Sequence, residues 1–401
     1  MPAYLYKIKD TSGLTLYGVS EAKNAQDIKR QFRDTEYYFI SAQGYPAGRF
    51  AHIHLGLDDL LMFTERLASL IEAGVPILQS MHILWKQSTV RDVQIIVTHI
   101  RKKLEDGATL YEAFSAFPNV FPTMYLALIS VAEVGGSLVE ILKKLSQYLQ
   151  DQKKFVSRVK RAAMYPMFVM SFAFLVLICM FAFVVPTFQK VLSKLHVELP
   201  LLTKILFNIS AFVRNVPLII FLVIVIIGGI ILYKFLRKSK GLDYMIDALK
   251  LKIPLFKDVY YPLLIGRFTR SFSLLIGSGV PVITSLTVAR GTVVNMYIES
   301  SIEEIKLQVM EGGSLYEAFK SIKTFPIMLV EMVGIGESTG KLQYLLEKVS
   351  DHLDAEVDYK LYKFLTILEP LLIIFVGAIV LVVLLGIYFP IFTLQNTLRT
   401  M

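Results

Sequence analysis

Cysteine is almost absent from this sequence, with Cys179 the only one among 401 residues. A single cysteine cannot form an internal disulfide, so nothing in the composition indicates an oxidised extracellular domain. Histidine is also scarce, and His52 and His54 of one polar segment are too few to hold a metal ion without further ligands. We therefore predict no metal site, and no motif predicts a cofactor. The first fifty residues contain no apolar stretch, so no cleavable signal peptide is expected.

Charged residues are missing from three long segments, 162–189, 215–233 and 370–398. Each contains about 20 apolar residues, enough for a helix to cross a hydrocarbon layer about 30 Å thick. A soluble protein rarely buries a helix of this length that is apolar on all sides. We expect three transmembrane helices, at residues 166–186, 216–235 and 370–390.

Lysine and arginine lie unevenly around these segments. Thirteen are found on the side of 147–166, 234–253 and the residues preceding the third span, and five on the opposite side. The positive-inside rule therefore predicts that the polar regions face the cytoplasm, while the loop 187–215 and the tail 391–401 face outward. The net charge of +9 follows largely from this topology, so nucleic acid is not predicted as a partner.

An internal repeat relates the two halves of the chain. The segment "FTERLASLIEAGVP" (63–76) recurs as "FTRSFSLLIGSGVP" (268–281), and "GATLYEAF" (107–114) recurs as "GGSLYEAF" (312–319). Both pairs are 205 residues apart, and after the loss of one residue the offset is 204. Such self-similarity indicates a duplicated structural unit. The residues that define the repeat are Gly74, Pro76, Gly136, Pro166, Gly279, Pro281, Gly340 and Pro370.

The repeat and the apolar segments together predict the fold class. We expect a mostly α protein with two homologous cytoplasmic helical-bundle modules, three transmembrane helices and a small N-terminal αβ piece. In that piece "AYLYKIK" and "LTLYGVS" alternate around "DTSG", the pattern of a β-hairpin. The expected divisions outside the spans are an αβ module at 1–42, a linker at 43–56, the first helical module at 57–165, a cytoplasmic connector at 236–261 and the second helical module at 262–369.

The segment "GIGESTGKL" (334–342) looks like a phosphate-binding loop but lacks its essential residues. Such a loop requires Gly-x4-Gly-Lys-[Ser/Thr], because backbone N–H groups surround the phosphate and the hydroxyl holds Mg²⁺. Here the first glycine position is Ile335, and Leu342 has no hydroxyl. We predict instead a turn between helices in which Gly136 and Gly340 adopt positive φ.

Hydroxyl residues followed three positions later by glutamate recur in both halves. Thr109 precedes Glu112 and Ser314 precedes Glu317, which is the spacing of a capping box at a helix start. No histidine or lysine base recurs beside these hydroxyls, so we predict no catalytic residues and no enzyme activity.

Three glutamates are the candidate partner-contact residues. Glu133 and Glu337 are equivalent in the repeat, and no other titratable group recurs beside them, so a structural or partner-contacting role is favoured over acid–base chemistry. Glu369 directly precedes Pro370 at the start of the third span, and its equivalent in the first half is Tyr165. Glu369 is either an acid at a helix N-terminus or a counter-ion for a positively charged group of a partner helix in the membrane.

The two copies of these motifs closely resemble the F-protein family of type II secretion systems, which includes the platform proteins of type IV pilus machines. The resemblance rests on "FTERLASLIEAGVPILQSMHIL" and its second copy, the "LYEAF" boxes, "AEVGGSLVEIL" and "GESTGKLQYLL", and covers nearly the whole chain. It implies a non-enzymatic platform in a bacterial inner membrane that couples a cytoplasmic hexameric ATPase to the insertion of pilin-like subunits into a fibre. The implied partners are that ATPase, pilin or pseudopilin subunits, other assembly proteins and further copies of this chain.

A membrane transporter or channel subunit is the alternative function. Substrate paths need polar groups or broken helices at mid-depth, and the predicted spans offer Ser171, Cys179 and several glycines. An intramembrane enzyme is the least favoured alternative, because the spans contain no pair of catalytic residue types.

Overall fold

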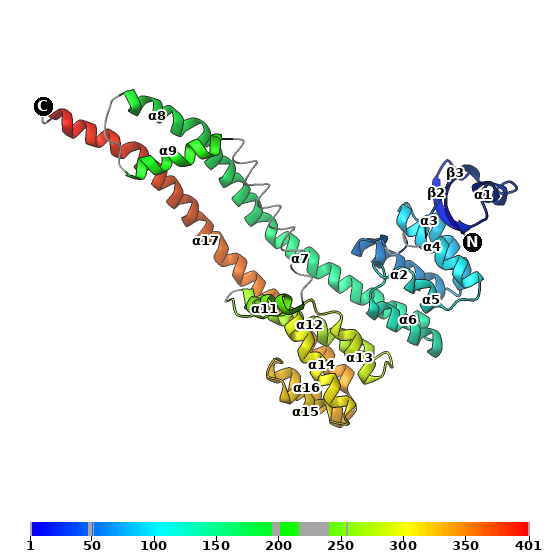
Figure 1. Ribbon diagram of the computed structural model, residues 1–401. Helices are drawn as coiled ribbons and strands as arrows, with labels where there is room; N and C mark the ends of the chain where they lie inside the picture. The colour runs from blue at the N-terminus through cyan, green and yellow to red at the C-terminus, as the bar shows by residue number, and fades with distance from the viewer. Residues whose placement is uncertain are drawn as a thin grey trace. The chain divides into compact units, whose positions relative to one another are not determined.

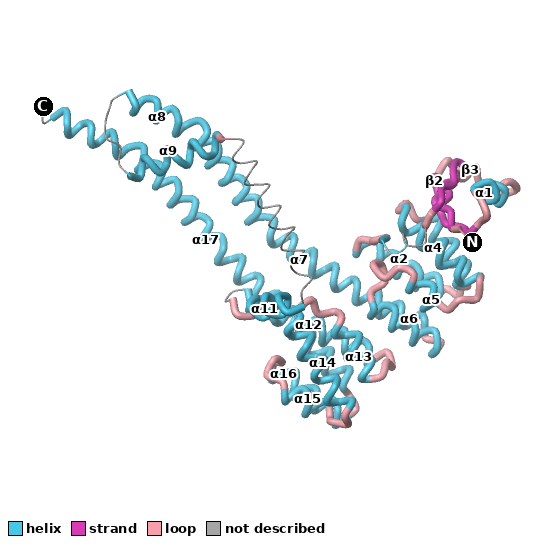
Figure 2. The backbone as a smooth tube through the Cα atoms, in the orientation of Figure 1, coloured by secondary structure: helices cyan, strands magenta, loops and turns pink. Residues whose placement is uncertain are grey.

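Helices make up most of the chain in the computed structural model (Figures 1 and 2). The structure describes residues 2–46, 50, 52–194, 201–215, 240–253 and 256–399. The mostly α prediction is confirmed, and strands occur within the described part of the chain only near the N-terminus. The predicted span at 216–235 lies outside the described residues.

The N-terminal segment folds into three strands and one short helix. These elements are β1 (Ala3–Lys9), β2 (Thr15–Glu21), α1 (Ala25–Gln31) and β3 (Tyr38–Gly44). The strands form an antiparallel sheet in the order β2-β1-β3, and the buried side chains of this segment include Ile8 of β1, Leu16 of β2 and Ile28 of α1. The predicted αβ piece is confirmed, although β3 extends into the segment predicted as a linker.

Two series of helices follow in the same order. The first comprises α2 (Leu57–Glu72), α3 (Ile77–Gln87), α4 (Arg91–Glu105), α5 (Leu110–Ser115), α6 (Thr123–Gly135) and α7 (Leu138–Cys179). The second comprises α12 (Phe256–Ile276), α13 (Val282–Arg290), α14 (Met296–Met310), α15 (Leu315–Ser321), α16 (Ile327–Thr339) and α17 (Leu342–Arg399). The last helix of each series is by far the longest, with 42 residues in α7 and 58 in α17.

The chain divides into two compact units. The first consists of Met1–Val156 and Tyr261–Ala355, and it contains the sheet and the shorter helices of both series. The second consists of Ser157–Tyr260 and Glu356–Met401, and it contains the apolar parts of α7 and α17.

In the first unit, side chains of α3 and α4 hold the edge strand β2. The Trp85 indole donates a hydrogen bond to the Tyr17 carbonyl at 2.6 Å, and the Tyr17 N–H donates to Gln94 Oε1 at 2.9 Å. One step along the strand, the Val19 N–H donates to Thr98 Oγ1 at 3.1 Å. A strand edge leaves its backbone groups unpaired, and these side chains satisfy them. The sheet is therefore fixed to the first helical series.

Aromatic side chains form the core of each helical series at equivalent positions. Phe63, Phe114 and Phe121 contact one another in the first series, with ring centroids 4.6–6.1 Å apart. In the second series these positions are occupied by Phe268, Phe319 and Phe325, with centroids 5.1–6.2 Å apart. Rings at these separations stabilise a core by apolar burial and by ring–ring contact, which is edge-to-face for Phe319 and Phe325 and tilted for the other pairs.

One buried hydrogen bond distinguishes the two cores. Thr64 Oγ1 lies 3.1 Å from the Tyr125 hydroxyl, and Tyr125 is buried at the centre of the first core. The equivalent residues of the second core are Thr269 and Leu329, and the buried Thr269 hydroxyl has no hydrogen-bond partner within the described part of the chain. The two series are therefore similar in architecture but not in polar chemistry.

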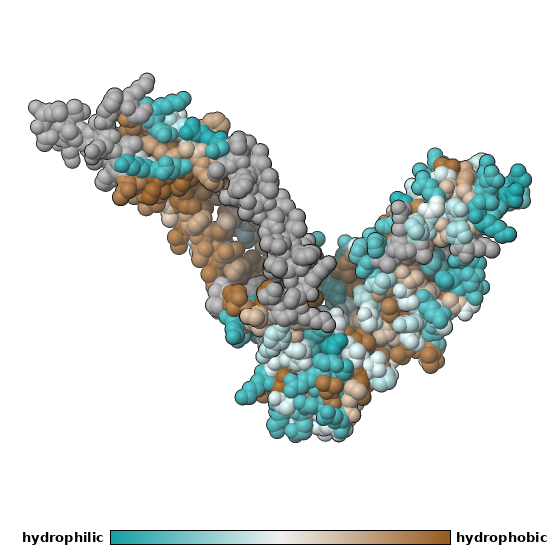
Figure 3. Space-filling model, viewed as in Figure 1, coloured by the Kyte–Doolittle hydropathy of each residue, from teal (hydrophilic) through white to brown (hydrophobic). Residues whose placement is uncertain are grey.

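The second unit contains two helices long and apolar enough to cross a membrane. They lie within Leu138–Leu192 and Leu342–Tyr388. In the most apolar stretch of 18 residues of each helix, only 11% and 22% of the residues are buried. Figure 3 shows apolar side chains gathered along the exposed length of α17. Large apolar side chains exposed along a whole helix indicate contact with lipid or with another protein.

The structure differs from the loop predicted at 187–215. The π-helix η2 (Met180–Val184) follows α7 directly, and α8 (Val185–Lys194) and α9 (Leu201–Arg214) occupy most of that segment. One face of α9 is buried through Leu206 and Phe207, which pack with residues of η2 and α17. A 3-4 apolar spacing stabilises a helix through this kind of packing. The predicted connector likewise contains α11 (Lys240–Lys250).

Candidate functional site

The repeated Glu133 completes the N-terminal cap of the short helix α5. Its two carboxylate oxygens accept hydrogen bonds from the Leu110 and Tyr111 N–H groups, at 2.7 and 3.3 Å. Thr109 Oγ1 accepts from the Glu112 N–H at 3.1 Å, and the Glu112 carboxylate accepts from the Thr109 N–H at 3.1 Å. All four N–H groups that a helix start leaves without partners are thus satisfied.

Glu337 occupies the same position at the start of α15. Its oxygens accept from the Leu315 and Tyr316 N–H groups at 2.8 and 2.9 Å. Ser314 Oγ accepts from the Glu317 N–H at 3.1 Å. The helix starts predicted from the hydroxyl–glutamate spacing are therefore confirmed in both series.

The two glutamates thus link neighbouring helices in the same way. Glu133 lies near the C-terminal end of α6 and Glu337 near the C-terminal end of α16. Each carboxylate therefore fixes the end of one helix to the start of another, α6 to α5 and α16 to α15. Both side chains are exposed, so each is also open to a partner. Contact with a partner protein stays a prediction for both residues. The only sequence signal for this link was the similar separation of "LYEAF" and glutamate in the two halves, 23 residues from Leu110 to Glu133 and 22 from Leu315 to Glu337.

The predicted turns of the repeat are confirmed. Gly136 and Gly340 are the C-caps of α6 and α16, with φ of 65° and 70°. The segment that looked like a phosphate-binding loop is therefore the end of a helix, where positive φ favours glycine. The glycines of the earlier repeated turn, Gly74 and Gly279, have φ of 81° and 83°. Pro76 and Pro281, which follow them, are the N-caps of α3 and α13.

Ion pairs join the first helix of each series to the last. In the first series Lys153 of α7 contacts Asp58 of α2 at 2.8 Å, and Lys143 of α7 contacts Glu72 at the other end of α2. Exposed pairs of this kind contribute little individually. Two pairs at opposite ends of one helix nevertheless fix the register between α2 and α7.

In the second series one guanidinium makes this connection. Arg270 of α12 donates to Asp351 at 2.9 Å and to Asp354 at 2.6 Å, both on α17. Arg270 is partly buried, which strengthens a charge-assisted hydrogen bond compared with an exposed one. In both series, therefore, the helix that continues into an apolar segment is fixed to the first helix of its own series.

The two series also contact each other within the first unit. Lys144 of α7 donates to the Gly277 carbonyl at the end of α12, at 3.0 Å, and α6 packs against α13. The charged group therefore satisfies a carbonyl at a helix C-terminus, a position that favours cations.

In the second unit, the structure brings Glu369 to its own repeat equivalent. The Tyr165 hydroxyl donates to Glu369 Oε1 at 3.0 Å, and the two residues are 204 positions apart. Nearby, Arg158 contacts Asp358 at 2.9 Å. The interpretation of Glu369 as an acid at a helix N-terminus is wrong, because α17 continues through Glu369 and Pro370 without a break. Pro166 likewise lies inside α7.

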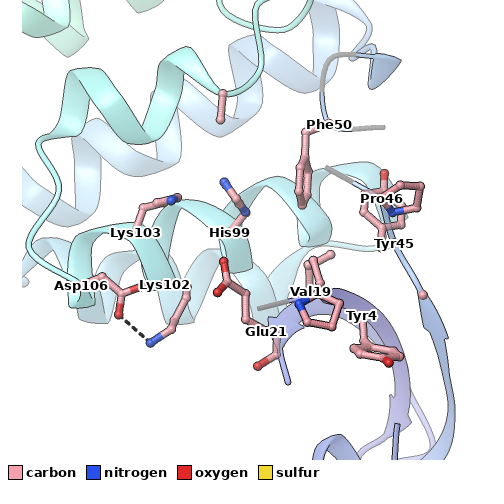
Figure 4. Close-up of a pocket in the computed structure, with 15 residues that line it drawn as sticks. Tyr4, Val19, Glu21, Tyr45, Pro46, Phe50, His99, Lys102, Lys103 and Asp106 are labelled. Carbon is pink, nitrogen blue, oxygen red and sulfur yellow. Dashed lines mark hydrogen bonds and ion pairs between the residues drawn. The ribbon is translucent and has the colours of Figure 1, made fainter. Parts of the chain in front are cut away.

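A cavity of about 740 Å³ lies between the sheet and α4. Figure 4 shows His99 beside Lys103 and Phe50, with Glu21 below and the ion pair of Lys102 and Asp106 at the rim. The His99 ring lies 4.3 Å from the Phe50 ring. Burial, aided by the positive charge of the Lys103 ammonium, lowers the pKa of His99 to about 4. His99 is therefore neutral at pH 7.

Within the described ranges, no three His, Cys, Asp or Glu side chains are grouped as metal ligands would be. His52 and His54 are not brought to further ligands, and Cys179 is exposed on α7. The chemistry that the structure does assemble consists of helix caps, ion pairs and hydrogen bonds between helices. Such contacts fix helices relative to one another.

A duplicated helical protein of this kind matches a known family. The model of the family "Type II secretion system (T2SS), protein F" matches the chain twice, at residues 63–186 and 268–390. The chain therefore belongs to the type II secretion system protein F family. Both matches run from the first helix of a series into its long apolar helix.

Curated relatives cover nearly the whole chain. The "Type IV pilus assembly protein PilC" of Thermus thermophilus is 32% identical over 408 residues, which is 99% of this chain and 99% of that protein. The "Type IV pilus assembly protein PilC" of Myxococcus xanthus is 32% identical over 85% of this chain and 81% of that protein. The "Type II secretion system protein F" of Pseudomonas aeruginosa is 27% identical over 99% of each chain.

Proposed function

We propose that this chain is a non-enzymatic inner-membrane platform protein of a type IV pilus or type II secretion machine. The family match and the names of its relatives, which include both pilus assembly and secretion proteins, support this function. In this role the two helical series are homologous cytoplasmic modules, and the chain needs no cofactor.

The proposed topology places the N-terminus and both modules in the cytoplasm and the C-terminal tail outside. The excess of lysine and arginine around the cytoplasmic ends of the apolar segments supports this orientation. The membrane helices are those at 166–186, 216–235 and 370–390. Two of them correspond to the apolar parts of α7 and α17.

The proposed partners follow from the role. A cytoplasmic hexameric assembly ATPase moves the modules, and pilin or pseudopilin subunits are moved at the membrane helices. Other inner-membrane assembly proteins and further copies of this chain complete the platform. Glu133, Glu337 and Glu369 are the residues we propose for partner contact, and photo-crosslinking from each position would identify what it touches.

The continuity of α7 and α17 is the observation that carries a mechanical role. Each helix begins among the short helices of its series and continues without interruption into an apolar segment. Each is also ion-paired to the first helix of its own series, through Asp58 in one case and Arg270 in the other. A hydrogen-bonded helix with such anchors transmits a displacement along its axis, whereas a flexible linker would absorb it.

Insertions that interrupt this continuity test the function. We would insert seven glycine and serine residues after Asp151 of α7 or after Asp354 of α17 in the full-length chain. The matched control is an insertion of seven helix-forming residues at the same point. Seven helical residues add about 10 Å but turn the remaining helix by only about 20°, so they preserve stiffness.

We expect the flexible insertions to abolish fibre assembly or secretion while the protein remains in the membrane at its normal level. The helical insertions retain a substantial part of the activity, because they still transmit displacement. Unimpaired fibre assembly with either flexible insertion would show that the modules and membrane helices work without mechanical continuity, and would overturn the proposal.

A further inference from the structure

Beyond Pro166 and Pro370, a second pair of prolines interrupts the backbone hydrogen bonding farther along the apolar helices. Pro186 follows η2, and Pro390 lies within α17, at the repeat offset of 204. Proline has no N–H, so each leaves a carbonyl of the preceding turn without its usual donor. Water is scarce in an apolar environment, and an unsatisfied carbonyl there is costly. Another donor is therefore needed at both places.

At the first proline, the donor comes from α9. The Val185 N–H donates to the Met180 carbonyl, five residues earlier, which is the π-helical pattern. Continuing this pattern by one residue would pair position 186 with the Phe181 carbonyl, but Pro186 has no N–H. Ser210 Oγ donates to the Phe181 carbonyl at 2.7 Å, and the Ser210 side chain is fully buried.

At the second proline, the donor comes from the same helix. The α-helical pattern would pair position 390 with the Gly386 carbonyl, and Pro390 cannot supply that bond. Thr203 Oγ1 donates to the Gly386 carbonyl at 2.7 Å, and Thr203 is fully buried. Gly386 also allows α9 to approach α17 closely, since a Cβ at position 386 would lie 2.0 Å from Leu206 Cδ1 of α9.

Both donors lie on one face of α9. Thr203 and Ser210 are seven residues apart, which is close to two turns of helix. Leu206 and Phe207 lie between them on the same face. They belong to one buried apolar cluster, whose members are Phe181, Val185, Leu192, Leu206, Phe207, Val383 and Ile387. The same face of α9 therefore contacts both long helices through polar and apolar groups.

We propose that α9 is a clamp that fastens the two proline-interrupted helices to each other, with Ser210 and Thr203 as the positioning residues. Each hydroxyl replaces the N–H that one proline lacks, so α9 fits only where both carbonyls are free. The clamp rests on the proposed function and deepens it, because it couples the membrane parts of the two repeats.

The test measures the distances from α9 to each long helix in the full-length protein in lipid nanodiscs. The native Cys179 of α7 carries one spin label, and Ile209→Cys on the exposed side of α9 carries the second. A separate pair, Ile209→Cys with Val382→Cys in a Cys179→Ser background, reports on α9 and α17. Pulsed electron paramagnetic resonance gives the distance distribution for each pair.

Each hydroxyl should affect one distance. Ser210→Ala is expected to broaden the distribution between α9 and α7, and Thr203→Val the distribution between α9 and α17. Thr203→Ser keeps the donor and should keep the narrow distribution. Thr187→Val is the matched control, because the exposed Thr187 hydroxyl donates only to the Phe183 carbonyl of its own turn. Narrow distributions in both Ser210→Ala and Thr203→Val would overturn the clamp.

A second pair of variants tests the contact without removing a donor. Gly386→Ala should push α9 away from α17 and broaden their distance, and adding Leu206→Ala should restore it by making room. Failure of this rescue counts against the clamp. Fibre assembly is then measured in the same variants. Broad distributions with normal fibre assembly would support the clamp and contradict the mechanical function, whereas broad distributions with lost assembly support both.

Discussion

The cap that Glu133 provides to α5 allows a quantitative test within one molecule. Replacing Glu133 by alanine removes the acceptor for two N–H groups, those of Leu110 and Tyr111. Because Glu133 is exposed, we expect a cost of about 1–2 kcal/mol to the local stability of α5, the range for lost caps and charged hydrogen bonds. Alanine favours the helix α6 itself, so the loss cannot be ascribed to helix propensity.

Hydrogen exchange on the full-length protein measures this cost locally. A loss of about 1.4 kcal/mol speeds exchange through local opening about tenfold, so the amides of 110–115 should exchange roughly 5–30 times faster. The second copy supplies the internal control. Glu133→Ala should leave 315–321 unchanged, and Glu337→Ala should do the reverse.

Two results would refute the reasoning. Unchanged exchange at 110–115 in Glu133→Ala would show that the carboxylate does not hold α5. Faster exchange in both segments after a single substitution would show that the effect is global. Glu133→Gln separates capping from partner contact, since it keeps an acceptor oxygen but removes the charge. Loss of partner crosslinking with little change in exchange would then assign Glu133 to an interface.

Two further predictions concern the N-terminal sheet and the cavity beside it. Gln94→Leu should leave the Tyr17 N–H without its acceptor and lower the free energy of unfolding by about 1–3 kcal/mol. It should also shift the fluorescence emission of Trp85, the only tryptophan, whereas Gln87→Leu at an exposed position should not. An unshifted emission spectrum in Gln94→Leu would contradict the contact described between β2 and the helices. For His99, a folded pKa of about 4 lies below the unfolded value of 6.5, so the unfolded state binds more protons between these values and stability falls as the pH drops through this window. His99→Gln should therefore remove up to about 3 kcal/mol of the pH dependence of stability, measured by thermal unfolding at several pH values. If the variant and the unmodified protein show the same dependence of stability on pH, the lowered pKa of His99 is refuted.

Features that depend on neighbouring residues could be predicted from the sequence. The β-hairpin, the helix starts at Thr109 and Ser314, and the positive φ of Gly136 and Gly340 all follow from residues within a few positions. Such features need no knowledge of the tertiary structure, because the relevant hydrogen bonds and steric limits are local.

Features that depend on distant residues were not predictable in the same way. The carboxylate of Glu133 reaches a helix start 23 residues earlier, and nothing near it in sequence identifies that partner. One of the two interpretations placed Glu369 at a helix start, where an acid is favoured, but α17 tolerates Pro370 within a long apolar segment. Membrane helices accept interior prolines when other groups satisfy the freed carbonyls.

The segment predicted as a loop shows the same limitation. The charge distribution and the flanking apolar spans favoured an external loop at 187–215, yet α9 forms there because its apolar face has two long helices to cover it. The missed signal was a pair of hydroxyls, Thr203 and Ser210, on one face of an apolar stretch. Two buried hydroxyls seven residues apart become meaningful only when the prolines they compensate are known.

The arrangement of anchors bears on how the two repeats act together. Each long helix is fixed separately to its own series, through Asp58 in α2 or Arg270 in α12. The proline-interrupted parts, in contrast, are fixed to each other through α9. Under the proposed function, a displacement that reaches one membrane helix is therefore transmitted to the other through Thr203 and Ser210. The two helical modules then act on one joined set of membrane helices. If the clamp is intact, α7 and α17 cannot move independently of each other in the membrane.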